Sequence, residues 1–210
     1  MTKRTLLSTT GAAILGLGLL TACGSDDSSS TPSSAAPTAA SAAFATPGAQ
    51  LVPLSTVEGE PTVQVPLPNG WQQTELPPEA AAATSYQIRL TLTAPALAEG
   101  GFTPNVIVVS SPSDADTQAV LDKEVQLATQ GDPQATVTTG STCGYPSATV
   151  ELELPAEGAV PARPGIGKII VVSHGTGSIT YSLTAQTLDA ENATYQQDVK
   201  TILDGIQITK

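Results

Sequence analysis

The sequence predicts an α+β domain built on an antiparallel sheet. Segments 86–93, 148–154 and 178–186 alternate apolar and polar residues with a period of two, as strands with one apolar and one more polar face do. Segments 114–129 and 190–204 instead place apolar residues at the spacing of an amphipathic helix. The order of strands, helix, strands, helix and strand lacks the strict alternation of a parallel sheet, which favours the α+β class.

Further strands follow from shorter apolar segments. The continuous runs 106–109 and 169–172 have no polar face, which favours central strands. Segment 173–177, with two glycines, joins two strand signals and predicts a hairpin. Segments 63–65 and 206–208 predict short strands at the two ends of the domain.

The first predicted helix has a beginning, an apolar face and an end. Ser113 and Asp116 resemble a capping box, and acidic residues there suit the positive end of the helix dipole. The apolar face consists of Leu121, Val125 and Ala128. Gly131 to Pro133 ends the helix.

The second predicted helix has a clear apolar stripe and ends at Gly205, its C′ residue. The stripe is formed by Tyr195, Val199, Ile202 and Leu203. A further, weak helix is expected over residues 79–83.

Residues 1–22 have the features of a secretory signal. Lys3 and Arg4 are followed by an apolar run from Leu6 to Leu20, shorter than the roughly 20 residues that a membrane span needs. The run ends in Leu-Thr-Ala-Cys, which resembles the lipobox of bacterial lipoproteins. We therefore expect cleavage between Ala22 and Cys23 and attachment of diacylglyceryl and palmitoyl groups to Cys23. An ordinary secreted protein with a chance cysteine is the alternative.

Residues 23–47 predict a tether, and residues 48–210 a single domain. Segment 24–47 is almost entirely Ala, Ser, Thr and Pro, and it cannot bury enough apolar surface to order itself. The expected arrangement is a domain held on the extracytoplasmic face of the cell membrane by its lipid anchor. The formal net charge of −11 argues against nucleic-acid binding, which needs Lys and Arg against phosphates.

The order of motifs resembles the mycobacterial LpqN/LpqT lipoproteins. After the lipobox and tether come Val63 to Trp71 with its Pro-x-Pro-x-Gly-Trp motif, a capped helix, Gly144 to Ala148 opening a strand, a hairpin, and a closing helix and strand. The resemblance implies a Mog1/PsbP-like α-β-α sandwich over most of residues 50–210. It also implies an envelope lipoprotein with no catalytic residues to carry over.

Two aromatic motifs are interpreted structurally. Pro68 to Gly70 predicts a tight turn, after which Trp71 closes one end of the core, and the alternative is that Trp71 stacks on a ligand. Gly144 to Pro146 likewise predicts a turn that enters a strand.

Residues for catalysis or metal binding are few. If Cys23 is acylated, Cys143 has no partner and is expected to be a small buried hydrophobe, with a disulfide or a reactive thiol as alternatives. A nucleophilic pair of Cys143 and His174 is conceivable, but a loop histidine and a core cysteine are the simpler interpretation. Zinc is not expected, and neither is any cofactor. Segment 165–168 lacks the spacing of a phosphate loop.

The carboxylates also have plain interpretations. Glu151 and Glu153 share one strand face and could bind calcium or serve as acid and base, but a solvated face, or pairing with Arg89, is simpler. Glu58 and Glu60 are expected to be solubilising loop charges.

Three functions follow. The first is a non-enzymatic adaptor or accessory lipoprotein with an envelope protein or lipid as partner. The second is a lipid carrier, which an apolar pocket of roughly 300–1,000 Å³ between a helix and the sheet would favour. The third is a hydrolase that uses Cys143 or the glutamate pair. Of these three functions, we expect a non-enzymatic one.

Overall fold

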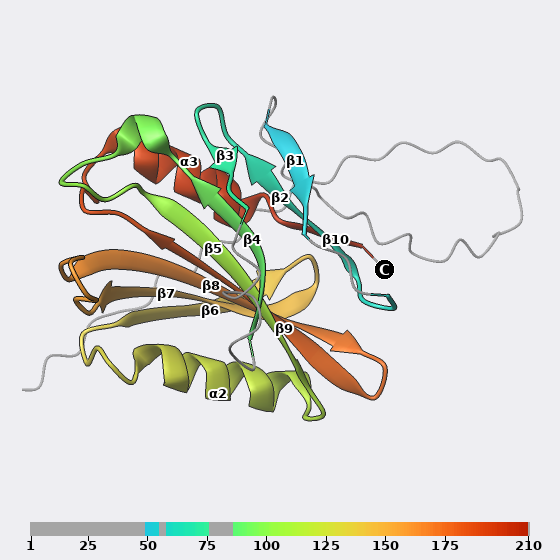
Figure 1. The fold of residues 1–210 in the computed structure, drawn as a ribbon. Helices are drawn as coiled ribbons and strands as arrows, with labels where there is room; N and C mark the ends of the chain where they lie inside the picture. The colour runs from blue at the N-terminus through green and yellow to red at the C-terminus, as the bar shows by residue number, and fades with distance from the viewer. Residues whose placement is uncertain (1–48, 55–57, 76–85, 210) are drawn as a thin grey trace, which may run out of the picture. The chain divides into compact units, whose positions relative to one another are not determined.

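The computed structural model describes residues 49–54, 58–75 and 86–209. The expected signal segment, the tether and the weak helix at 79–83 lie outside these residues. Within them, a large antiparallel sheet is combined with two α-helices and a small second sheet (Figure 1). The α+β class predicted from the sequence is confirmed.

The large sheet has the strand order β3-β4-β5-β9-β8-β7-β6, and every neighbouring pair is antiparallel. Its strands are β3 (Gln72–Gln73), β4 (Gln87–Thr93), β5 (Asn105–Ser113), β6 (Thr136–Thr142), β7 (Tyr145–Leu154), β8 (Arg163–His174) and β9 (Gly177–Gln186). The small sheet has the order β1-β2-β10. It contains β1 (Gln50–Pro53), β2 (Thr62–Leu67) and β10 (Gln207–Thr209).

The helices lie on opposite faces of the large sheet (Figure 1). Helix α2 (Thr117–Thr129) packs on β7, β8 and β9. Helix α3 (Ala193–Asp204) and the small sheet cover the other face, and a 3₁₀ turn, η1 (Pro95–Leu97), follows β4. The sandwich therefore has α2 as one outer layer and α3 with the small sheet as the other.

Strand β8 shows why its apolar run is continuous. Ile169 and Val171 belong to the apolar cluster under α2, whereas Ile170 and Val172 belong to the larger cluster under α3. All four side chains are buried. A strand covered on both faces needs apolar residues at successive positions, as the sequence predicted.

Helix boundaries differ slightly from the prediction. Asp116, and not Ser113, is the N-cap of α2, because β5 continues through Ser113 and the Asp116 carboxylate accepts from the backbone N–H groups of Gln118 and Ala119. Helix α3 begins at Ala193 rather than 190 and is capped by the Asn192 side chain.

Gly205 ends α3 as predicted, but for a different reason. Its φ of −90° is open to any residue. A β-carbon there would come within 2.7 Å of the Thr201 carbonyl oxygen and 2.5 Å of Pro66 Cγ. Close packing against the small sheet, and not a left-handed backbone, requires the glycine.

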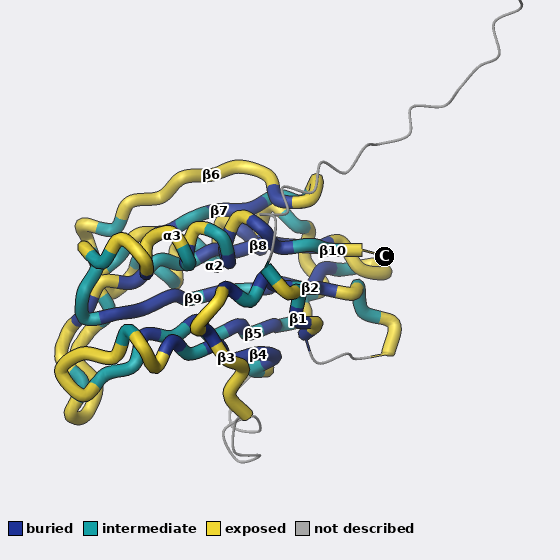
Figure 2. Tube along the Cα trace, turned by 90° about the horizontal axis from the view of Figure 1, so that it is seen from above, coloured by how far each residue is buried: buried dark blue, intermediate teal, exposed yellow. Residues whose placement is uncertain are grey.

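Strand β6 was not predicted and forms one edge of the large sheet. Its threonine-rich sequence carries no charge, and six of its seven residues are exposed (Figure 2). Because neither face is apolar, periodicity could not reveal it. It is joined to β7 by the two-residue turn Cys143-Gly144, in which both residues have positive φ.

Candidate functional site

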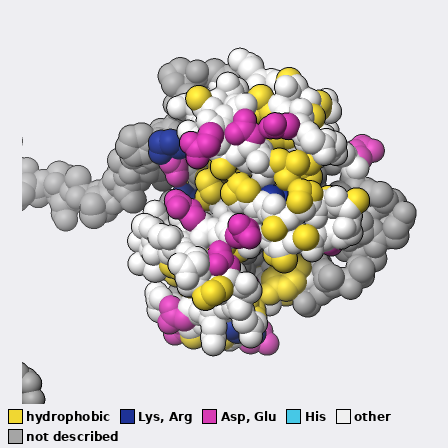
Figure 3. Space-filling model, turned by 90° about the vertical axis from the view of Figure 1, so that its left-hand side faces the viewer, with side chains coloured by type: hydrophobic (Ala, Val, Ile, Leu, Met, Phe, Trp, Pro, Cys, Tyr) yellow, Lys and Arg dark blue, Asp and Glu magenta, His cyan; other side chains and the backbone are white. Residues whose placement is uncertain are grey.

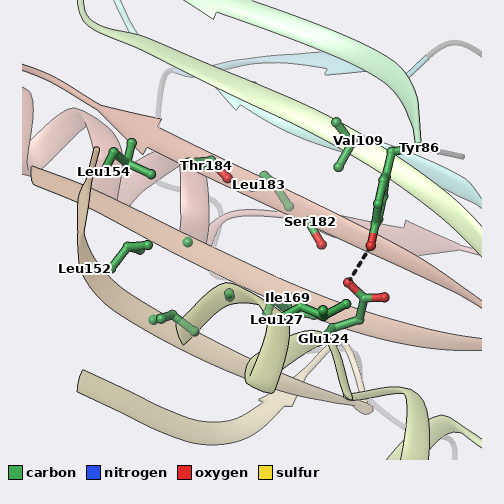
Figure 4. Close-up of a pocket in the computed structure, with 13 residues that line it drawn as sticks. Tyr86, Val109, Glu124, Leu127, Leu152, Leu154, Ile169, Ser182, Leu183 and Thr184 are labelled. Atoms are coloured by element: carbon green, nitrogen blue, oxygen red, sulfur yellow. Dashed lines mark hydrogen bonds between the residues drawn. The ribbon is translucent and has the colours of Figure 1, made fainter. Parts of the chain in front are cut away.

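A cavity of about 480 Å³ lies between α2 and the large sheet (Figure 4). Most of its lining is apolar. The lining residues come from α2, from strands β5, β7, β8 and β9, and, for Tyr86, from the position just before β4. The lining residues are Tyr86, Val109, Glu124, Leu127, Ala128, Val150, Leu152, Leu154, Gly167, Ile169, Ser182, Leu183 and Thr184. Its volume falls in the range typical of small-molecule sites.

The alternating pattern of β7 supplies one wall of the cavity. Val150, Leu152 and Leu154 lie on the same strand face and all line it. Ala148, on that same face, belongs to the cluster under α2. The periodicity of the sequence predicted this apolar face of the strand, but periodicity alone does not indicate that the helix above it leaves a space.

Glycine in β8 helps to make the space. A β-carbon added at Gly167 would make only ordinary contacts, 3.7 Å from the Val150 carbonyl oxygen and 3.9 Å from that of Leu183. Gly165, two residues earlier on the same strand, is covered by the Leu154 side chain. Glycine inside a strand weakens it and often marks a site where another group approaches closely. The Gly-x-Gly spacing within a strand was the available sequence signal for this cavity.

The lining also contains polar side chains, and two of them contact each other. The Tyr86 hydroxyl donates to a carboxylate oxygen of Glu124 at 3.4 Å, and the two side chains point toward one another (Figure 4). Burial, together with the nearby Glu124 charge and this hydrogen bond, raises the pKa of Tyr86. Ser182 and Thr184 add hydroxyl groups from β9. Tyr86 is thus held as a neutral phenol beside a carboxylate.

One end of the molecule combines apolar and acidic surface. Leu127, a lining residue of α2, is 47% exposed, so it lies where the cavity opens. Figure 3 shows hydrophobic side chains gathered in the middle of one face, with Asp and Glu side chains around them.

Arg89 does not pair with Glu151 or Glu153, which corrects one sequence prediction. It is buried on β4, separated from β7 by three strands of the sheet. Its guanidinium forms an ion pair with Glu60 at 2.7 Å and donates to the Ser110 hydroxyl at 2.9 Å. Glu60 is therefore a structural partner and not the loop charge that was expected, whereas Glu58 is exposed as predicted.

Glu151 and Glu153 are exposed on β7, as the solvated interpretation expects. The backbone N–H of Glu153 donates to the Asp132 carboxylate. In the part of the chain that the structure describes, no group of three or more His, Cys, Asp or Glu side chains is placed to hold a metal ion.

Cys143 is exposed, which makes the prediction of a buried cysteine wrong. Its position in the tight turn between β6 and β7 holds it at φ 53°, and its Sγ donates to the Ile206 carbonyl at 3.2 Å. His174 is exposed at the end of β8, beside the predicted hairpin turn. The hydrogen bond that the structure gives to Cys143 is with a backbone carbonyl and not with the imidazole.

Trp71 closes the core as predicted. The turn before it is formed by Gly70 at φ 86° and by the Trp71 N–H donating to Pro68 at 3.1 Å. The indole is buried, lies 6.4 Å from the Tyr195 ring in a stacked arrangement, and donates to Asp198 at 2.8 Å. These contacts are structural and place the indole in the core cluster on the α3 side of the sheet. Tyr145 opens β7, as predicted from the Gly-Tyr-Pro motif.

Ala22 and Cys23 lie outside the described residues, so cleavage and lipid attachment remain predictions. None of the helices in the described ranges has both the length and the apolar character that crossing a bilayer requires.

Fold, layers and cavity define a class of protein: an α+β sandwich with an apolar space between one helix and an antiparallel sheet. Residues 48–209 match the family described as "Probable lipoprotein LpqN", and the chain belongs to this family. The resemblance noted from the motifs is thereby confirmed.

Similarity to one solved structure supports the fold. The crystal structure of LpqN of Mycobacterium tuberculosis, described as involved in cell envelope biogenesis, aligns with a TM-score of 0.59 at 18% identity. The alignment covers 78% of this chain and 92% of that one. A protein of Bacteroides thetaiotaomicron VPI-5482 aligns with a TM-score of only 0.42 at 11% identity, over 73% of this chain and 50% of that one. No curated protein matches the sequence.

Proposed function

We propose that this protein is an extracytoplasmic envelope lipoprotein whose domain binds the apolar chain of a lipid in the cavity under α2. The cavity is the observation that supports this function over that of a purely structural adaptor. A lipid-binding domain needs a cavity of this volume with a mostly apolar lining, whereas an adaptor needs none.

The energetics of burial favour a chain-like ligand. Each methylene moved from water into an apolar site contributes about 0.8 kcal/mol, so roughly ten methylenes contribute about 8 kcal/mol before the entropic cost of association. Such a ligand leaves its polar end at the opening, where Tyr86, Glu124 and the half-exposed Leu127 lie. The domain would then shield the apolar chain of the lipid from water while the lipid moves between membrane and wall.

An anchor at Cys23 would place this activity at the membrane. Segment 1–22 and the Leu-Thr-Ala-Cys motif support acylation, and the tether predicted from composition would let the domain reach above the headgroups. The M. tuberculosis relative, described as involved in cell envelope biogenesis, supports the same compartment.

The anchor can be tested separately. We expect the Cys23→Ala variant to remain unacylated and uncleaved, as measured by incorporation of labelled palmitate and by N-terminal sequencing. Continued labelling of this variant would overturn the assignment of the anchor.

A protein-binding adaptor is the second candidate, and strand β6 favours it. This edge strand is seven residues long, uncharged and exposed along most of its length. Such an edge offers backbone groups to which a partner strand can add. A role as accessory subunit is compatible with lipid binding, because β6 and the cavity are separate.

The lipid-binding function is tested by native mass spectrometry of the mature polypeptide bearing Cys23→Ser, exported by its own host behind a signal peptide that the ordinary secretory signal peptidase removes. This variant carries no acyl anchor and needs no detergent. We expect a population whose mass exceeds that of the polypeptide by one lipid, and solvent extraction should release that lipid. A homogeneous lipid-free polypeptide that also fails to take up added amphiphiles contradicts the proposal.

A further inference from the structure

We infer that Glu124 makes the cavity select amphiphiles whose head group donates hydrogen bonds, a hydroxyl or an ammonium, over those that end in a carboxylate. This inference rests on the proposed function and concerns the head group rather than the chain. The observation behind it is that the lining contains a single charged side chain and that this side chain is acidic.

The basic side chains of the described residues are engaged or placed elsewhere. Arg89 pairs with Glu60, and Lys168 and Lys200 both pair with Asp204 of α3. Arg163 donates to Gln186 and lies over the Phe102 ring.

Lys123 is the basic residue next to Glu124 in sequence. It is exposed, and it is not part of the lining. Successive residues of a helix point about 100° apart, so Lys123 does not share the inward direction of Glu124. No described lysine or arginine is therefore positioned in the cavity to neutralise an anionic head group.

The hydrogen-bonding groups are biased in the same direction. An ionised carboxylate only accepts hydrogen bonds, and the Tyr86 hydroxyl directs its proton to Glu124. The raised pKa of Tyr86 keeps that proton in place at neutral pH. A hydroxyl or ammonium head group can donate to Glu124, whereas a carboxylate head group meets a like charge.

The size of the effect follows from Coulomb's law. Two unit charges about 6 Å apart, at an effective dielectric constant between those of protein and water, change the affinity by about tenfold. Because Glu124 lies beside Tyr86 and is the charged side chain of the lining, it acts on the head group and leaves chain burial unchanged.

The test compares laurate, dodecanol and dodecylamine, which share one chain length and differ in the head group. Binding to the Cys23→Ser mature polypeptide is measured by isothermal titration calorimetry at pH 7.5. We expect laurate to bind about tenfold more weakly than dodecanol, and dodecylamine at least as tightly as dodecanol. Glu124→Gln keeps the shape of the side chain and should bring the three affinities within about threefold.

Asp122→Asn is the matched control, since it removes one negative charge from the same helix at an exposed position outside the lining. It should retain the discrimination against laurate. Equal affinities of all three ligands for the unsubstituted cavity overturn the selectivity and leave lipid binding intact. Failure of all three to bind overturns the proposed function and the selectivity with it.

Discussion

Leu154 lies directly over Gly165. A β-carbon built on Gly165 would come within 2.9 Å of Leu154 Cδ1 and 3.0 Å of its Cγ. The two residues belong to paired strands, β7 and β8, in which Gly165 is registered with Leu152. The leucine therefore occupies the volume that a side chain at 165 would need, and it forms part of the cavity wall.

Substitution of Gly165 is expected to destabilise the domain through this contact. Gly165→Val should lower the free energy of unfolding by about 1–3 kcal/mol, the usual effect of overpacking. In the double variant with Leu154→Ala, the valine gains room, so the two effects should not add. Urea unfolding of the four members of this cycle measures the coupling, and strict additivity would contradict the contact.

Gly167 is expected to behave differently, because a β-carbon there makes only ordinary contacts and the residue lines the cavity. Gly167→Leu should fill part of the cavity and weaken lipid binding by at least about tenfold, while the free energy of unfolding changes by less than about 1 kcal/mol. Calorimetric titration with dodecanol and urea unfolding measure the two effects.

The matched control for that change is Gly140→Leu on the exposed edge strand β6, where an added β-carbon meets nothing within 4 Å. This variant should bind dodecanol as the unsubstituted protein does. Equal binding by both leucine variants would show that the cavity is not the binding site.

Glu60 and Glu58 are expected to differ in importance although they are two residues apart. Glu60→Ala removes the carboxylate that pairs with the buried Arg89 guanidinium, and the domain should lose about 2–4 kcal/mol of stability. Glu58→Ala, at an exposed position, should change stability by less than about 0.5 kcal/mol. Chemical denaturation of both variants makes the comparison, and equal effects would argue against the ion pair.

Tyr181 offers a prediction of the opposite sign. Its hydroxyl is buried and has no hydrogen-bond partner among the described residues, so Tyr181→Phe should be neutral or stabilise by up to about 1 kcal/mol at pH 7.

The same side chain predicts a pH dependence. Burial, with a smaller contribution from the Glu60 charge, raises the pKa of Tyr181 to about 12. The unfolded chain loses this proton near pH 10, whereas the folded domain keeps it. The free energy of unfolding is therefore unaffected by this group below pH 10 and declines as the pH rises toward 12. Unfolding measured between pH 9 and 12 should show a shallower decline for Tyr181→Phe, and parallel curves would contradict the assignment.

Periodicity predicted the elements that have an apolar face. Strands β7 and β9 and both helices were found because their apolar residues recur at the spacing of their secondary structure. Strand β6 was missed because its threonines lie on an exposed edge strand of the sheet, where neither face needs to be apolar.

Side-chain environments were harder to predict than elements. Arg89 was placed on the more polar face of its strand, but the register of β4 shifts between Ile88 and Leu90, and the arginine is buried. Cys143 was assigned to the core on the usual behaviour of cysteine, but the two-residue turn exposes it. Both outcomes depend on local backbone irregularities that residue type does not reveal.

The cavity could be anticipated only as a possibility. The apolar faces of β7 and of the helix at 114–129, which form its walls, were predicted. Whether a cavity remains between them depends on the distance from the helix to the sheet and on the side chains that fill this space. Gly167 was the local sequence feature that indicated the cavity. In the sequence this glycine was considered only as part of segment 165–168, which lacks the spacing of a phosphate loop.

The position of Trp71 has a practical consequence. It is the one tryptophan of the chain, and it is held between Tyr195 and Asp198 on the face of the sheet opposite α2. Its fluorescence emission therefore reports on the packing of α3 and the small sheet, and not on events in the cavity. The protein thus carries a built-in optical control: a ligand that alters calorimetric heats without shifting the indole spectrum has bound without loosening the core.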